Sequence, residues 1–171
     1  AEDGIRDVER SRGLGDVYKR QHEGSAGAGK MRGGFGLDYK LELRNGEALA
    51  SFVMDHGRFG PQGALGGNDG DVNKVVILRN GSSYVPKHLS KEQDITLAPG
   101  DRVWVRTPGG GGYGDPLQRP VDAVREDVRL ERYSLAEACD LYGVVLIKKN
   151  NVLCVDEEET VKLRREMKRS F

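Results

Sequence analysis

The stretch TPGGGGYGDP, which ends at Pro116, holds five glycines in ten residues directly behind a segment typical of a β-strand. Gly109, Gly111 and Gly114 match the GxGxxG spacing of dinucleotide-binding turns. That motif requires a helix to open within it, so that the helix N-terminus meets the pyrophosphate. Pro116 and Pro120 interrupt the chain where this helix would form. A Walker A loop would need a Lys followed by Ser or Thr, which these glycines lack. The sequence therefore argues against a nucleotide site here.

Two interpretations of the glycine run remain open. Its consecutive N–H groups could line an anion-binding concavity. Alternatively, the run could be backbone that passes close to other backbone, where only glycine fits. Tyr113 and Asp115 are the only side chains of this stretch with chemistry to offer. The candidate rim of a substrate-binding site consists of Arg58, Gly109, Gly110, Gly111, Gly112, Tyr113 and Asp115.

Catalytic patterns are scarce elsewhere in the sequence. His56 and His88 are separated by a loop and a hairpin, and no HExxH, GxSxG or Ser-His-Asp pattern occurs. Asp55 and His56 beside Arg58 could bind an anion, but the spacing of these residues alone supports no more specific prediction. We predict no catalytic residue and no metal ligand within this sequence.

The bulk composition excludes several classes of protein. The 171 residues can form one domain with a core. Lys and Arg number 27 and Asp and Glu also 27, so no net field attracts nucleic acid or an anionic membrane. No apolar stretch approaches the roughly 20 residues that span a bilayer, and no signal peptide is recognisable. We therefore expect a cytoplasmic protein. Cys139 and Cys154 lack zinc-ligand spacing and are interpreted as core residues.

Residues 1–21 differ in character from the rest. They lack an initiator methionine and any hydrophobic periodicity, and they join abruptly to a glycine-rich stretch. They look like translated sequencing-adapter read-through, of the kind found in metagenomic reading frames. We therefore exclude them from the fold, as one excludes an expression scar, and expect the genuine coding sequence to begin near His22 after loss of its 5′ portion. A genuine charged N-terminal arm is the alternative.

Strands and turns are expected from Leu37 to Thr107. Residues 37–44 alternate apolar and charged side chains, and Asn45-Gly46 favours a hairpin to a returning strand over 47–54. A glycine-rich loop, either ordered or disordered, follows over 55–71. The remaining β signals are a hairpin turned by Asn80-Gly81, then strands over 94–97 and 103–105 around the turn Pro99-Gly100-Asp101.

Helical signals follow Pro116. Val121, Val124 and Val128 fall on one helical stripe behind Pro120. Further signals are a capping box at Ser134 and Glu137 with Gly143 as the C-terminal glycine, a hairpin of 144–147 with 152–155, and a final helix that starts at Asp156 and Glu159. We predict an α+β fold: a β-rich domain with an antiparallel sheet or sandwich over 22–117, followed by a helical segment with a small hairpin over 118–171.

Four motifs together resemble a known family. SAGAGKMRGGFGLDYKLELRNG from Ser25, HGRFGPQGALGGNDG from His56, LAPGDRVWVRTPGGGGYGDP and DVRLERYSLAEACDLYGVVL occur in the order and spacing of the C-terminal part of the hydantoinase B/5-oxoprolinase family. The similarity spans roughly Glu23 to Leu146. Family members are several times longer, which makes this chain similar to a fragment of a larger enzyme subunit.

The resemblance implies a cyclic-amide hydrolase of the 5-oxoprolinase or N-methylhydantoinase type. It implies an A-type partner that uses ATP and Mg²⁺ within a hetero-oligomer, and a divalent metal bound by an N-terminal part that this chain lacks. The glycine motifs would then form scaffold or rim, and the chain alone would be inactive. Two alternatives stay open: a fragment of a ketone carboxylase α subunit, and a non-catalytic β-rich binding or assembly module.

Overall fold

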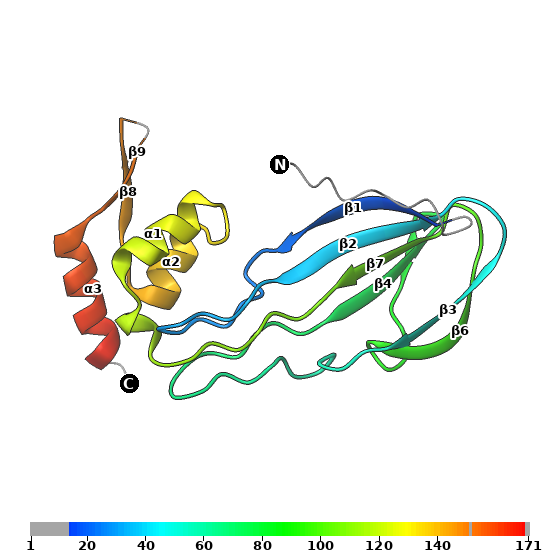
Figure 1. Cartoon of the computed structure of the whole chain (residues 1–171), viewed down its shortest axis with the longest axis horizontal. Coiled ribbons are helices and arrows are strands. Elements are labelled where there is room, and N and C mark those ends of the chain that lie inside the picture. Colours follow the sequence, from blue (N-terminus) through cyan, green and yellow to red (C-terminus); the bar gives the residue numbers. More distant parts are fainter. Residues whose placement is uncertain (1–13, 151, 170–171) are drawn as a thin grey trace, which may run out of the picture.

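The computed structural model describes residues 14–150 and 152–169. They form an elongated molecule with a two-layer β region at one end, helices at the other, and extended segments between the two (Figure 1). The elements in chain order are β1 (Leu14–His22), β2 (Gly36–Leu43), β3 (Ala48–Val53), β4 (Lys74–Arg79), β5 (Ser82–Tyr84), β6 (Lys91–Leu97), β7 (Arg102–Arg106), the 3-10 turn η1 (Pro116–Gln118), α1 (Val121–Arg129), α2 (Leu135–Tyr142), β8 (Leu146–Lys149), β9 (Val152–Val155) and α3 (Glu157–Arg169). The predicted α+β class is confirmed.

Five strands form the larger antiparallel sheet, in the order β1-β2-β7-β4-β5. Strands distant in sequence become neighbours: Tyr39 of β2 lies opposite Val105 of β7, and Val105 lies opposite Val75 of β4. Successive side chains of a strand point to opposite faces, so Val75 and Val105 are buried while Lys40 and Trp104 lie on the other face. The alternation that predicts these strands therefore also predicts their buried side.

Strands β3 and β6 form a second sheet that packs on the first. The predicted hairpin between 37–44 and 47–54 is wrong, because β2 pairs with β1 and β7 whereas β3 pairs with β6. Gly46, with φ of 74°, turns the chain across to the other layer. Ala50 and Phe52 then pack against the core of the first sheet, and side-by-side pairing with β2 would not give them this burial.

The small turns follow their local signals. The hairpin of β4 and β5 turns at Asn80 and Gly81, both with positive φ. Near the sandwich corner, the Leu43 N–H donates to the Asp101 carbonyl at 2.9 Å, and the Gly100 N–H donates to the Leu43 carbonyl at 2.7 Å. These bonds hold the two connections between layers side by side.

Strand β1 uses residues 14–22, most of which lie in the segment that the sequence analysis excludes from the fold. Leu14 lies opposite Leu43 of β2 and His22 opposite Gly36. The structure thus corrects the exclusion for residues 14–21, because backbone pairing needs no periodic pattern of apolar side chains. Residues 1–13 lie outside the described residues, and the adapter origin stays a prediction.

The helical end agrees with its predicted caps. Ser134 Oγ accepts from the Glu137 N–H, and the Glu137 carboxylate accepts from the Ser134 N–H at 2.7 Å, which completes the capping box of α2. Gly143 ends α2 in the left-handed conformation with φ of 59°. Asp156 precedes α3, and its Oδ1 accepts from the Glu159 N–H at 3.2 Å. These local signals define the ends of α2 and the start of α3.

Two hydrophobic clusters stabilise the two ends. The cluster between the sheets contains Leu43, Val75, Ile77, Leu97, Val103 and Val105. The cluster among the helices contains Ala28, Val124, Tyr133, Ala138, Tyr142, Val144 and Leu146. Ala28 belongs to an extended segment rather than to a helix, so this segment is anchored in the helical core. Within the described residues, no helix has the length and apolar character to cross a membrane.

Candidate functional site

The glycine run lies within a bundle of extended segments that connects the β region to the helices (Figure 1). We call residues 24–36, 57–71 and 107–115 the glycine bundle. Their backbones hydrogen-bond in several directions: the Gly27 N–H donates to the Gly110 carbonyl at 2.8 Å, the Gly110 N–H to the Gly34 carbonyl at 2.9 Å, and the Gly112 N–H to the Asn68 carbonyl at 2.8 Å. Residues 109–112 therefore have neighbours from both other segments.

Close approach, rather than an unusual dihedral angle, requires the glycines of this run. The φ angles of residues 109–112 lie outside the left-handed region. A Cβ on Gly109 would collide with the Ser25 carbonyl, one on Gly111 with the Gln62 carbonyl, and one on Gly112 with the Ala28 carbonyl, each at less than the 3.0 Å that real Cβ atoms respect. These contacts favour backbone packing over an anion-binding concavity, since the Gly110 and Gly112 N–H groups are already bonded to carbonyls.

Close backbone approach also explains glycines of the 57–71 segment. Gly57, Gly60 and Gly63 are three residues apart in the sequence, and a Cβ on Gly57 would meet the Ser90 hydroxyl. The segment folds back after a turn at which Leu65 and Gly66 both have positive φ. A Cβ on Gly60 would then collide with the Gly70 carbonyl, and one on Gly63 with that of Gly67.

Tyr113 and Asp115 follow the run where the bundle meets the helical end. Tyr113 exchanges two backbone hydrogen bonds with Met31, at 2.8 and 3.0 Å, and the residue is 52% exposed. The Asp115 Oδ1 accepts from the Leu117 N–H at 2.8 Å and so caps the turn η1. Asp115 also lines a cavity of about 360 Å³ with residues from η1, α2 and α3. Asp115 therefore has two roles: it caps η1 through the bond from the Leu117 N–H, and it forms part of the lining of a small cavity.

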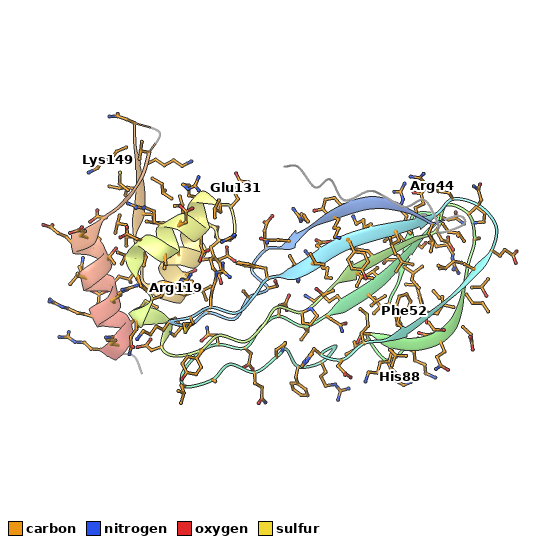
Figure 2. The ribbon with its side chains drawn as sticks, in the orientation of Figure 1. Arg44, Phe52, His88, Arg119, Glu131 and Lys149 are labelled. Carbon is orange, nitrogen blue, oxygen red and sulfur yellow. The ribbon has the colours of Figure 1, made fainter. Side chains whose placement is uncertain are left out.

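Arg58 lies apart from the other predicted rim residues. It lines a cleft of about 580 Å³ formed by residues 54–59 and 87–91, and none of residues 109–115 lines this cleft. His88, from the second wall, lies beside β3 and β6, far from Arg119 near the helices (Figure 2). The structure thus brings Gly109 to Asp115 together, whereas Arg58, at the start of the 57–71 segment, lines a separate cleft.

A buried ion cluster, which the sequence analysis did not identify, joins the bundle to the helices. Asp127 of α1 receives bonds from Arg32 at 3.0 and 3.1 Å, from Arg119 at 2.8 Å and from Arg132 at 3.2 Å. The Asp127 side chain is 4% exposed. Because Arg32 comes from the bundle and the other arginines flank α1, one carboxylate ties three chain segments together.

The arginines control the protonation of Asp127. Burial is the largest single influence and disfavours the carboxylate, but the hydrogen bond and charge of Arg32, together with Arg132 and Arg119, outweigh it. The pKa of Asp127 therefore lies below its ordinary value of 3.8. One sequence signal could have located this residue: Asp127 follows Val124 of the buried stripe by three residues, so it borders that stripe, where an acid needs a partner.

The described residues offer no candidate metal centre. No group of three or more His, Cys, Asp or Glu side chains in residues 14–150 and 152–169 is arranged to hold an ion. Cys139 and Cys154 are both free and half-buried. We therefore assign no chemical step to a metal held by these residues.

Two solved structures have a similar fold over most of the chain. An ATP-dependent caprolactamase from Pseudomonas jessenii aligns with a TM-score of 0.69 and 28% identity, covering 90% of this chain and 26% of that one. A nucleotide-free acetone carboxylase aligns with a TM-score of 0.71 and 21% identity, covering 92% and 25%. The sandwich, glycine bundle and helical end are thus an arrangement found within larger enzymes.

Sequence comparison identifies the family. Residues 18–116, which include the whole glycine bundle, match hydantoinase B/oxoprolinase. The chain is 37% identical over 142 residues to an uncharacterized protein of Methanocaldococcus jannaschii, and 36% identical over 130 residues to the caprolactamase subunit beta of Pseudomonas jessenii. These matches cover 83% and 71% of this chain but 24% and 21% of the relatives. The chain belongs to the hydantoinase B/oxoprolinase family and spans about a quarter of the length of these relatives.

Proposed function

We propose that this chain is the C-terminal part of the B-type subunit of an ATP-dependent cyclic-amide hydrolase of the hydantoinase or 5-oxoprolinase kind. The observation that carries the proposal is the 36% identity to a caprolactamase subunit beta over 71% of the chain. The family match covers the segments that form the glycine bundle, which supports a shared framework rather than a shared surface motif.

The chemistry of a cyclic amide explains why such an enzyme would separate phosphorylation of the substrate from opening of the ring. Resonance protects the lactam carbonyl from water, and conversion of the enol oxygen to a phosphate creates a leaving group. We propose that an A-type partner binds ATP and Mg²⁺ and phosphorylates the substrate within a hetero-oligomer. A divalent metal would be bound by protein outside this chain. In this scheme Gly109 to Asp115 contribute the rim of the site, and the chain has no activity by itself.

A ketone carboxylase is the second candidate. The likeness to acetone carboxylase favours it at the level of fold, but 21% identity carries no argument about the reaction. The higher identity to caprolactamase makes hydrolysis the preferred reaction. A non-catalytic binding or assembly role and a cytoplasmic location stay predictions from the sequence.

A chimera tests the proposed function. This chain replaces the matching region of the caprolactamase subunit beta from Pseudomonas jessenii, and the chimera is produced together with the other caprolactamase subunit. We expect caprolactam-dependent hydrolysis of ATP and release of the ring-opened product. Product is measured by mass spectrometry, and this chain alone serves as the blank.

Two controls make the result interpretable. A chimera with Gly112→Val places a branched side chain against the Ala28 carbonyl and should abolish activity together with folding. A chimera with Arg125→Gln changes an exposed charge of α1 and should remain active. A folded chimera that assembles with its partner subunit but opens no ring would refute the proposed role.

A further inference from the structure

The cleft that contains Arg58 concentrates positive charge in a protein without net charge. Three permanent cations line it, Arg58, Lys87 and Lys91, against one carboxylate, Asp55. Lys91 and Asp55 neutralise each other through an ion pair of 2.7 Å. Within the part of the chain that the structure describes, neither Arg58 nor the Lys87 ammonium forms an ion pair within 4.0 Å. Two positive charges of the cleft therefore have no ion-pair partner among the described residues.

A further carboxylate, that of Glu92, lies next to Lys87 and reduces this excess without removing it. Glu92 accepts from the Tyr84 hydroxyl at 2.5 and 2.6 Å and from the Lys87 backbone N–H at 2.5 Å. Glu92 does not line the cleft, but it keeps its negative charge and lies against Lys87, so it offsets part of the Lys87 charge. Arg58 therefore supplies the larger share of the positive excess inside the cleft, and Lys87 supplies the smaller share.

The two walls of the cleft are fixed relative to each other. The Met54 N–H donates to the Ser90 carbonyl at 3.2 Å, and the Ser90 hydroxyl donates to the Met54 carbonyl at 2.9 Å. Ser90 is only 2% exposed. On the first wall, the Asn73 N–H also donates to the His56 carbonyl at 2.9 Å. The cations therefore lie on a preformed surface, which lowers the entropic cost of binding a ligand.

Each wall contains one non-glycine residue in the left-handed conformation. These residues are His56, with φ of 62°, and Leu89, with φ of 61°. Side chains with a Cβ rarely adopt this conformation, and it persists where the surrounding structure enforces it, often at ligand sites. His56 Nδ1 lies 3.2 Å from the Phe59 carbonyl, which can only accept, so Nδ1 carries the proton. Nε2 remains as a second polar group of the first wall.

Apolar side chains complete the lining. Met54, Phe59 and Leu89 line the same cleft, and Phe59 is 76% exposed. A bare inorganic ion would leave these groups in water, whereas an organic ligand would cover them. The volume of about 580 Å³ accommodates a small molecule.

We propose that this cleft binds the oxyanion group, a carboxylate or a phosphate, of a small organic molecule. Arg58 and Lys87 bind the oxyanion, and Phe59 and Leu89 cover the apolar part. The proposal explains why the hypothesis of anion binding at Asp55, His56 and Arg58 could not advance from spacing: the second cation comes from the opposite wall. It does not depend on the proposed hydrolase function.

Titration of the whole chain with three probes, followed by backbone amide NMR, tests the proposal. Benzoate and phenyl phosphate represent the two oxyanions, and benzyl alcohol is their neutral analogue. We expect saturable shifts at residues 56–59 and 87–90 from at least one anion and none from the alcohol. The anion that saturates at the lower concentration identifies the preferred group.

Substitution of each cation measures how much Arg58 and Lys87 contribute to the affinity for the ligand. Arg58→Gln and Lys87→Gln should each weaken binding about tenfold, the effect of losing one charge-assisted hydrogen bond. Both side chains are exposed, so the fold should persist, and the amide spectrum verifies this. Arg125→Gln, which removes an exposed cation from α1, is the matched control and should bind normally. Absence of saturation at concentrations on the order of 10 mM, equal shifts from benzyl alcohol, or equal weakening in the control would each overturn the proposal.

Discussion

Glycines serve two separable purposes in this protein, and the surroundings of each residue distinguish them. Gly46, Gly81 and Gly100 have positive φ and no heavy atom within 4 Å of a hypothetical Cβ, so they are needed for their dihedral angles. Gly111 and Gly112 have ordinary φ angles but touch carbonyls of other segments. Substitution of the first type strains one turn, whereas substitution of the second type separates two backbones.

The bundle offers a matched pair for testing this distinction. Gly112→Ala should destabilise the protein by about 3 kcal/mol, because the methyl group collides with the Ala28 carbonyl and backbone cannot yield as a side chain can. Gly34→Ala, in the same bundle, meets nothing within 4 Å and should stabilise by about 0.5 kcal/mol through the unfolded state. Urea denaturation of both variants measures the difference. Similar losses in both variants would contradict packing as the reason for glycine.

The second residue-scale prediction concerns Asp127. Asp127→Asn removes the only charge that compensates Arg32, Arg119 and Arg132 within the cluster, and should cost about 3 kcal/mol. The free energy of unfolding is measured by chemical denaturation at pH 7. An unchanged free energy would show that the arginines are compensated by solvent.

The same carboxylate predicts a pH dependence. The pKa of Asp127 is below 3.8 in the folded protein, so its contribution is complete above that pH and disappears as the pH falls through the folded-state pKa. We expect the stability difference between the natural protein and Asp127→Asn to shrink below about pH 4. Denaturation curves at pH 7, 4 and 3 test this expectation. A difference that stays constant across this range would exclude ionisation of Asp127 as its source.

At the scale of elements, local signals and long-range pairing behave differently. The capping box and the left-handed Gly143 define α2 from a few adjacent residues. The partner of β2, by contrast, is decided by burial in a second layer, and the Asn45-Gly46 signal predicts the turn but not the pairing. Neighbouring residues therefore determine where an element ends, whereas residues far apart in the chain determine which elements contact each other.

Helix α2 provides the element-scale prediction. Ser134→Ala leaves the N–H of Glu137 without its Oγ acceptor and should cost about 1 kcal/mol, whereas Ser134→Asn should restore most of the loss. Thermal unfolding followed by circular dichroism compares the two variants. Equal stability of Ser134→Ala and the natural protein would mean that solvent replaces the cap.

At the scale of the whole molecule, the glycine bundle couples two cores that share no side chain. The sandwich cluster contains Val103 and Val105, which lead directly into the glycine run, and the helical cluster contains Ala28 from the bundle itself. Arg32 and Asp127 add an ionic link from the bundle to α1. We therefore expect the two ends to unfold together.

This coupling can be measured with probes at opposite ends. Val124→Ala opens a cavity in the helical cluster, where Val124 is 0% exposed, and should cost about 2 kcal/mol. Trp104 lies in β7 of the sandwich and reports unfolding by fluorescence. The fluorescence and helical dichroism midpoints should shift by the same amount. A fluorescence transition that stays at its original midpoint would show that the ends unfold independently.

The sequence by itself determined the elements whose causes are local: the alternation that forms β2 and β7, the turns at Asn80-Gly81 and Pro99-Gly100, and the caps at Ser134, Gly143 and Asp156. Its four motifs also predicted the family, which the match over residues 18–116 confirms. These inferences succeed because each depends on the dihedral preferences or side-chain periodicity of neighbouring residues.

Tertiary structure alone decided the pairing of β3 with β6, the inclusion of residues 14–21 in the sheet, and the use of the glycines. It also placed Arg58 opposite Lys87 and assembled three arginines around Asp127. The physical reason is shared: burial, close backbone approach and charge compensation depend on distances between residues far apart in the chain. Local sequence constrains conformation at each position, whereas these distances arise only when the two cores and the glycine bundle are packed together.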